Sequence, residues 1–170
     1  FYPFKSFETR VIDPYIVGAT VIATNPLTNE DITALITNNA VTDSNGSFIY
    51  NQNYVKNTLQ LKYFKITATG GTDKYTGAQF KGVLKAIVNV ENNPSVVTPI
   101  TTIVANNSTG SSNATMKSSV LGQEESIANK LNLRATDLNK DPIVNENPDV
   151  MKSITILAII TNSLLKFGDY

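Results

Sequence analysis

Carboxylates are the only side chains in this sequence with strong acid–base or metal-binding potential, because the chain contains no His and no Cys. It therefore has no thiol nucleophile, Cys-type zinc site or Ser-His-Asp triad. The stretch "TDSNGSFIY" (42–50) could open a calcium loop at Asp43, but such a loop needs a bidentate Glu at its twelfth position, where this chain has Tyr54. We interpret the stretch as a tight hairpin turn on Asn45-Gly46, and keep Asp43 as a second-choice calcium ligand.

The remaining acidic residues also favour structural roles. Asp73 lies in "GGTDKYTG", which is typical of a turn, and it is the second candidate calcium ligand. Glu124 and Glu125 are adjacent in a predicted helix, about 100° apart around its axis, which indicates a solvated helix face. Asp137 and Asp141 flank a predicted inter-helix turn, where Asp commonly accepts backbone hydrogen bonds. The sequence thus predicts no catalytic residue, no cofactor other than possible calcium, and no enzyme activity.

Charge and hydropathy exclude two kinds of partner. Lys+Arg and Asp+Glu both number 14, which argues against electrostatic binding to nucleic acid. The longest apolar run, "ITILAII" (154–160), is too short to span a bilayer, so no membrane span is expected. Because the chain begins at Phe1 and not at Met, we expect that an export signal has been removed.

Polarity in this chain comes mostly from neutral residues. Twenty Asn and twenty Thr suit turns and strands, which favours a β-rich, surface-facing protein. Four N-x-[ST] sequons offer glycosylation sites in an exported protein. They are Asn45, Asn106, Asn107 and Asn113.

The elements that must position these residues differ between the two parts of the chain. Apolar and polar residues alternate with strand period up to residue 105, for example Ile32, Ala34 and Ile36 in "DITALIT", and this predicts a mainly β fold, an antiparallel β-sandwich. The segment 106–115 is small and polar, as in a linker or exposed loop. Helical spacing then predicts a small two-helix C-terminal unit over 116–170, with Asn147 as the N-cap of the second helix.

Several short motifs resemble one known family. "VTDSNGSFIY" resembles the T-D-x-x-G-x-F signature of carboxypeptidase-regulatory-like (transthyretin-like) β-sandwich modules, and "VIDPYIVGATVIA" is similar to their first core strands. "GGTDKYTGAQFKGVLKA", "VVTPITTIVA" and "LNLRATDLNKDPI" resemble the tail of such modules in bacterial surface and secreted proteins. The resemblance implies an Ig-like sandwich at 11–105, a helical extension and an extracellular or cell-surface setting. Calcium is less expected, because "TNPLTNEDIT" lacks the alternating carboxylates found in relatives.

Two apolar segments are the predicted interaction surfaces. Residues 1–10 form an expected extended arm that packs across its own sandwich or adds as a strand to a neighbouring subunit. The second surface is the last helix. The predicted interaction residues are Phe1, Tyr2, Phe4, Phe7, Ile154, Leu157, Leu164 and Leu165.

The predicted function is that of a non-catalytic structural or adhesive module of a cell-surface assembly. It would associate with itself or with other surface subunits, and strand addition by the arm would build a filament. The alternative is a glycan-binding accessory module of a secreted protein, which requires exposed aromatic side chains on a sheet face. Its candidates are Tyr50, Tyr54, Tyr63 and Tyr75.

Overall fold

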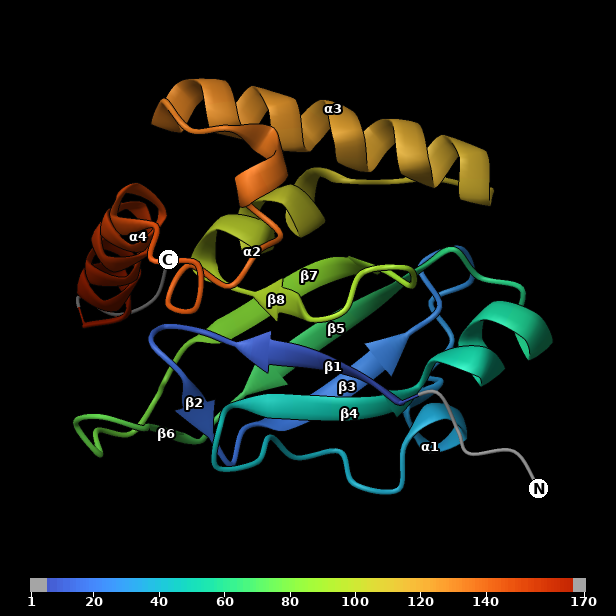
Figure 1. Ribbon diagram of the computed structural model, residues 1–170, viewed down its shortest axis with the longest axis horizontal. Helices are drawn as coiled ribbons and strands as arrows, with labels where there is room; N and C mark the ends of the chain where they lie inside the picture. Colours follow the sequence, from blue (N-terminus) through green and yellow to red (C-terminus); the bar gives the residue numbers. More distant parts are fainter. Residues whose placement is uncertain (1–5, 167–170) are drawn as a thin grey trace.

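Two small β-sheets and a layer of helices are stacked on one another in the computed structural model (Figure 1). The structure describes residues 6–166, and the side chains of residues 6–160. The predicted arm residues Phe1, Tyr2 and Phe4 lie outside this described part.

The first sheet has the strand order β4-β1-β8. Its central strand β1 (Ser6–Val11) pairs antiparallel with β4 (Ser47–Asn51) and parallel with β8 (Ser95–Val97). Residues 6–10 of the predicted arm are therefore part of the chain's own sheet. Phe7 is buried there, with its ring centroid 6.1 Å from that of Tyr50.

The second sheet has the order β3-β5-β7 and is fully antiparallel. Its strands are β3 (Thr20–Thr24), β5 (Tyr63–Thr69) and β7 (Val83–Asn89). A short ribbon of β2 (Ile16–Val17) and β6 (Thr72–Asp73) extends one end of the molecule. Alternate residues of each strand face the space between the sheets, as period-two burial requires.

The two sheets bury one shared core. Phe48 and Tyr50 of β4 meet Phe64 of β5, and the Tyr50 and Phe64 rings lie 4.8 Å apart in an edge-on arrangement. Such pairs stabilise beyond their area burial, by about 0.5–1.5 kcal/mol. Ile66 and Ala68 complete the inward face of β5.

Helices form the third layer. They are α2 (Pro99–Asn107), α3 (Asn113–Leu131) and α4 (Pro148–Lys166), with a 3₁₀ turn at Ala135–Asp137. The short helix α1 (Thr33–Ile36) and a π-helical turn at Tyr54–Thr58 pack instead against the core between the sheets. The outer face of β5 contributes Tyr63 to a second core with Ile100 of α2, Met116 and Val120 of α3, and Ile154 of α4. In Figure 1, α2 lies between the sheets and α3.

The mainly β sandwich predicted from the sequence is wrong as a fold class. Helical residues outnumber strand residues, the sheets contain only two or three strands, and the fold is mixed α/β. The segments 33–36 and 99–105, both assigned to the sandwich, are helical. Thr98 begins α2 with a capping box, which the sequence analysis overlooked.

Half of the predicted linker is helical. Residues 106 and 107 end α2, and residues 113–115 begin α3. The side chain of Asn113 fixes this junction, since it accepts from the Lys62 N–H and donates to the Gln60 carbonyl. Only residues 108–112 connect the two helices.

Side chains bond to backbone groups of one outer strand in each sheet. Along β4, Asp43 bonds both backbone groups of Ser47, and the Thr37 hydroxyl donates to the Ile49 carbonyl. Along β7, the Lys85 N–H donates to Thr102 and the Lys85 carbonyl accepts from Thr101. These contacts occupy groups that a further strand would need.

The edge at β3 is closed by backbone instead. The Val21 N–H donates to the Ala40 carbonyl, and the Thr42 N–H donates to the Ala19 carbonyl. Residues 40–42 thus lie alongside β3. Contacts within the described residues thus occupy some of the backbone groups at the edges of β3, β4 and β7.

Candidate binding cleft

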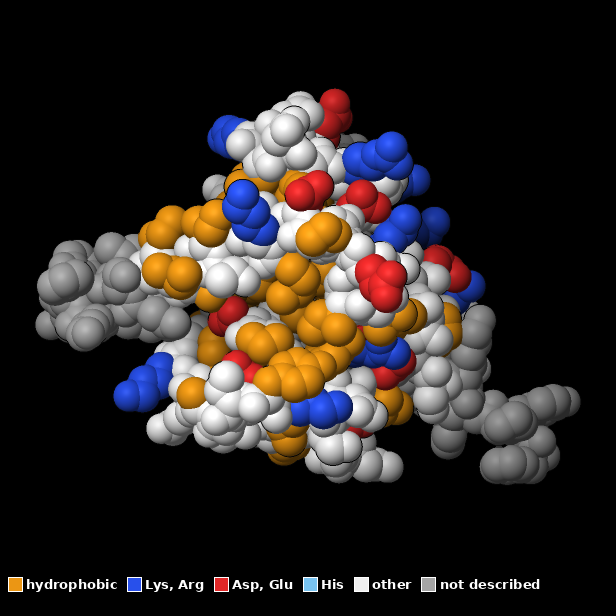
Figure 2. Space-filling model, turned by 60° about the vertical axis from the view of Figure 1, so that its left-hand side comes forward, with side chains coloured by type: hydrophobic (Ala, Val, Ile, Leu, Met, Phe, Trp, Pro, Cys, Tyr) orange, Lys and Arg blue, Asp and Glu red, His pale blue; other side chains and the backbone are white. Residues whose placement is uncertain are grey.

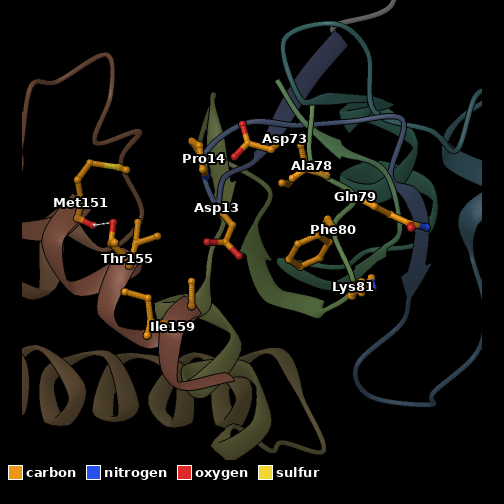
Figure 3. Close-up of a pocket in the computed structure, with 13 residues that line it drawn as sticks. Asp13, Pro14, Asp73, Ala78, Gln79, Phe80, Lys81, Met151, Thr155 and Ile159 are labelled. Carbon is orange, nitrogen blue, oxygen red and sulfur yellow. Dashed lines mark hydrogen bonds between the residues drawn. The ribbon is translucent and has the colours of Figure 1, made fainter. Parts of the chain in front are cut away.

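A cleft of about 650 Å³ lies between α4 and the end of the sheets that carries β2 and β6. We call it the α4 cleft. The turn after β1 and the connection from β6 to β7 form one wall, and α4 forms the other (Figure 3). Figure 2 shows hydrophobic side chains lining a hollow on this side of the molecule, with acidic side chains at its border.

Asp13 is the central polar group of the α4 cleft. It follows the end of β1 and precedes Pro14, whose ring fixes the turn that leads to β2. The side chain is half-buried and points into the space between α4 and Phe80 (Figure 3). No residue in the described part of the chain donates a hydrogen bond to its carboxylate or forms an ion pair with it. Among residues 6–160, Asp13 is therefore a carboxylate without a compensating partner.

This environment makes Asp13 a weaker acid. Burial, and then the charge of Asp73, raise the pKa of Asp13 to about 7. A cation or a hydrogen-bond donor brought by a ligand would favour the charged form of this carboxylate.

The remainder of the α4 cleft is largely apolar. Met151, Ile154, Ala158 and Ile159 project from successive turns of α4, and Phe80 faces them from the opposite wall. Lys81 also lines the cleft, but it is exposed, and no ion pair joins it to Asp13. An occupant would thus meet a broad apolar surface with the Asp13 carboxylate inside it and Asp73 also in the lining.

The α4 cleft continues into a second hollow of about 290 Å³. Asp13, Phe80 and Ala158 line both spaces, and Leu157 and Ile103 line the second one. Asp13 therefore lies where the two spaces meet.

The outward side of α4 is apolar as well. Ile156, Ile159 and Ile160 are 47%, 59% and 51% exposed. Ile159 belongs to both this surface and the cleft lining, so the apolar surface runs from the cleft around the helix. Contiguous exposed apolar surface commonly marks a contact site for another molecule.

A buried ion pair holds α4 in position opposite β1. Asp141, in the loop before α4, accepts from Arg10 Nη1 at 2.9 Å and from the Tyr15 hydroxyl at 2.7 Å. Its other oxygen accepts from the Ile143 and Val144 N–H groups. Burial alone would raise the pKa of Asp141, but the hydrogen bonds from Tyr15, Arg10 and the backbone lower it.

The helix start is also fixed locally. The Asn147 side chain accepts from the Val150 N–H at 3.2 Å, with Pro148 as the first helical residue and Asp149 in the first turn. The predicted N-cap is confirmed. The negative side chain of Asp149 suits the positive end of the helix dipole.

The two predicted calcium ligands serve turns. Asp43 Oδ1 accepts from the Asn45 and Ser47 N–H groups. Asp73 Oδ1 accepts from the Tyr75 and Thr76 N–H groups. The turn at Asp43 is present, but β4 after it pairs with β1, so the predicted hairpin is wrong.

No group of three or more Asp, Glu, His or Cys side chains in the described residues is arranged to hold a metal ion. The helices of that same part of the chain also lack the length and apolarity needed to cross a bilayer.

Glu124 departs from the prediction of a solvated helix face, whereas Glu125 is exposed as expected. Glu124 is buried against the second core and accepts from the Asn139 side chain. Burial raises the pKa of Glu124, and Asn139 partly offsets this rise. Its position among apolar residues at helical spacing was the available signal, since that face of α3 turns inward.

The predicted interaction residues of α4 have different surroundings. Ile154 is 1% exposed and belongs to the helical core, so it is not a free surface residue. Leu157 is partly buried against that core and also lines the second hollow. Leu164 and Leu165 lie in α4, but their side chains are outside the described part. The apolar surface is formed by Ile156, Ile159 and Ile160 instead.

The predicted sequons lie on the surface or near it. Asn45, Asn106 and Asn107 are exposed, whereas Asn113 is half-buried at the start of α3. Asn45 accepts from Lys74, and Asn106 accepts from Lys85.

The tyrosines proposed for glycan binding do not form one exposed platform. Tyr50 and Tyr63 are buried and Tyr54 is half-buried, while Tyr75 is 62% exposed. Tyr63 instead lies beneath a second cleft of about 590 Å³ between the sheets and α3.

Comparison with known proteins adds nothing to this geometry: no family model, no curated protein and no solved structure matches the chain. The resemblance to carboxypeptidase-regulatory-like modules therefore stays a prediction.

Sequence reasoning missed Asp13, the group at the centre of the α4 cleft. The available signal was an acidic residue among apolar neighbours, in "VIDPYIV", directly after a predicted strand. Nothing local indicates that α4, more than a hundred residues later, lies opposite it.

Proposed function

We propose that this protein is a non-catalytic extracellular module of a cell-surface assembly, and that it binds a protein partner in the α4 cleft. The occupant is an apolar segment that carries a lysine or arginine. The observation that carries this proposal is Asp13, a half-buried carboxylate without a partner among the described residues, set in an apolar cleft.

A bound cation would compensate the solvation that the Asp13 carboxylate has lost. A carboxylate that is partly withdrawn from water without hydrogen bonds is unfavourable in its charged form. An incoming cation replaces the lost solvation, while Phe80, Ile159 and Met151 supply apolar contact. The charge then confers specificity, and the apolar lining supplies most of the binding free energy.

The extracellular setting is supported by sequence features. The stretch "VTDSNGSFIY" and the later motifs resemble modules of bacterial surface proteins, and neutral Asn and Thr dominate the polar residues. The rigid connection between Arg10 and Asp141 suits a module that transmits load between partners.

Two matched peptides test the binding proposal. The acetylated pentapeptide LFPLK and its counterpart LFPLE are titrated into the ¹⁵N-labelled chain, and amide NMR signals are followed. We expect the lysine peptide to bind at least about fivefold more tightly, an electrostatic contribution of about 1 kcal/mol. The shifted signals should come from Lys81, Thr155 and Ala158.

Three variants then test whether the peptides bind in the α4 cleft. Asp13→Asn should abolish the preference for the lysine peptide, and Ile159→Asp should weaken binding of both peptides. Asp149→Asn changes an exposed carboxylate at the start of the same helix and should leave the preference unchanged. Equal affinity for the two peptides, or shifts confined to other surfaces, would refute the proposal.

The glycan-binding alternative receives less support. The second cleft is lined by several Asn side chains that could bind sugar hydroxyl groups. Most of these amides already bond within the chain, however. Asn139 donates to Glu124, Asn93 accepts from the Glu8 N–H, and Asn145 donates to the Asp141 carbonyl.

A further inference from the structure

We propose that the occupant of the α4 cleft is residues 1–5 of a second copy of this chain, with Lys5 of one copy facing Asp13 of the other. This inference rests on the proposed function and names the partner. It replaces strand addition by a side-chain contact as the mode of self-association.

The segment has the chemistry that the cleft requires. Residues 1–5 read FYPFK, so three aromatic side chains and one lysine occur within five positions. Aromatic side chains each bury roughly 150–250 Å² when they are fully covered. The cleft offers Phe80, Met151 and Ile159 to the rings, and Asp13 to the cation.

The cation of this segment cannot reach the Asp13 of its own chain. Lys5 directly precedes Ser6, where β1 begins, and Asp13 lies two residues beyond the other end of β1. A strand of six residues extends for about 17 Å at 3.3 Å per residue, well beyond the reach of a lysine side chain. The contact between Lys5 and Asp13 is therefore possible only between two copies.

The arrangement of the fold suits such a contact. β1 begins on the side of α1 and runs toward α4 (Figure 1), so Ser6, which follows the donor segment in the chain, lies at the end of β1 remote from the acceptor cleft. Each copy can therefore donate a segment and accept one. Because the contact joins two different surfaces, it produces rings or filaments, or a pair of antiparallel copies that exchange segments.

Occupied backbone groups at two outer strands argue against strand addition at these edges. Asp43, Thr37, Thr101 and Thr102 occupy backbone groups of the outer strands β4 and β7. An arm that added to either edge would have to displace them. The α4 cleft needs no such displacement.

Charge reversal tests the pair directly. Sedimentation velocity at pH 8, over a range of concentrations, should show association of the full chain. Lys5→Glu and Asp13→Lys each place like charges opposite one another, and each should weaken association at least about tenfold. In an equimolar mixture of the two variants, both contacts pair opposite charges again, and association should return to within about threefold of the unmodified chain.

A matched control accompanies these variants. Lys62→Glu reverses an exposed lysine outside the α4 cleft and should leave association unchanged. Recovery in the mixture also excludes misfolding as the cause of the single-variant losses, because a misfolded chain would not recover its partner.

Two results would overturn the inference. One is a chain that stays monomeric at every concentration, and the other is a mixture that associates no better than its components. If the LFPLK peptide still binds the cleft in either case, the proposed function stands and only the identity of the occupant is wrong. If that peptide also fails to bind, both proposals fall.

Discussion

Arg10 Nη1 lies 2.9 Å from Asp141 Oδ2, although 131 residues separate the two in the sequence. Tyr15 donates to the same carboxylate oxygen, and Arg10 also contacts Glu8. The first strand of the chain is thereby joined to the loop that leads into its last helix. Asp13 of the α4 cleft lies between Arg10 and Tyr15 in the chain, so one wall of the cleft is close in sequence to this contact.

Removal of the Asp141 carboxylate should destabilise the fold strongly. Asp141→Ala leaves Arg10 partly buried beside Glu8 alone and deprives Tyr15 and two backbone N–H groups of their acceptor. We expect a loss of about 3–5 kcal/mol in the free energy of unfolding, measured by urea denaturation. Asp137→Ala, which breaks a surface pair with Lys140 at 3.6 Å, should cost about 1 kcal/mol or less. Similar losses for the two variants would contradict the assigned role of Asp141.

Asp141 should also affect how steeply the free energy of unfolding falls at acid pH. Its pKa is lowered in the folded state, so its contribution is complete above the unfolded pKa of about 3.9 and is lost as the pH falls through the folded value. Asp141→Asn should therefore flatten the loss of stability below about pH 4. The measurement is the urea midpoint from pH 2.5 to 6, and an unchanged acid slope would refute this assignment.

Asp13 should have the opposite effect on the pH dependence of stability. Its folded pKa is raised to about 7, so the folded state binds more protons than the unfolded state between about pH 4 and 7, and stability falls as the pH rises through this window. Since Asp13 is partly exposed, the contribution should remain below about 1.4 kcal/mol per pH unit. Asp13→Asn should remove this part of the slope and raise the urea midpoint at pH 8. A midpoint unaffected by the substitution at pH 8 would show that the carboxylate is well solvated.

Two isoleucines five positions apart on α4 should respond very differently to truncation. Ile154 is 1% exposed and packs in the helical core, so Ile154→Ala should cost about 2–5 kcal/mol. Ile159 is 59% exposed, so Ile159→Ala should change stability by about 0.5 kcal/mol or less. Thermal unfolding of the two variants measures the difference. A large loss for Ile159→Ala would mean that its side chain is covered in solution.

Two tyrosines should give changes of opposite sign when their hydroxyl groups are removed. The Tyr50 hydroxyl is buried without a hydrogen-bond partner among the described residues, so Tyr50→Phe should raise the free energy of unfolding by up to about 1 kcal/mol. The Tyr15 hydroxyl donates to Asp141, so Tyr15→Phe should lower it by about 1.5–3 kcal/mol. Destabilisation by Tyr50→Phe would show that its hydroxyl does have a partner, for example a buried water.

The local sequence pattern predicted those elements in which the spacing of apolar residues fits only one kind of secondary structure. The alternation predicted for residues up to 105 is present in β3, where Val21 and Ala23 are buried, and Asn147 was recognised as the cap of the last helix. The same reasoning failed at Ile32 and Ile36. A spacing of four fits both a strand face and one turn of helix, and the chain forms α1 there.

The α4 cleft was beyond the reach of such patterns. Asp13, Phe80 and Ile159 come from three distant segments, and their meeting depends on how the helices cover the second sheet. Glu124 illustrates the same limit, because its burial depends on Asn139 and on the sheet beneath α3. Helical spacing shows which residues share a face, but not which neighbour that face will meet.

Since hydroxyl and carboxylate side chains occupy backbone groups of β4 and β7, crowded copies of the molecule can collide without pairing these two strands into amyloid-like ladders. Association through side chains, as proposed for Lys5 and Asp13, can be reversed by salt or acid without unfolding either molecule. A lattice built this way could be dismantled and its components used again.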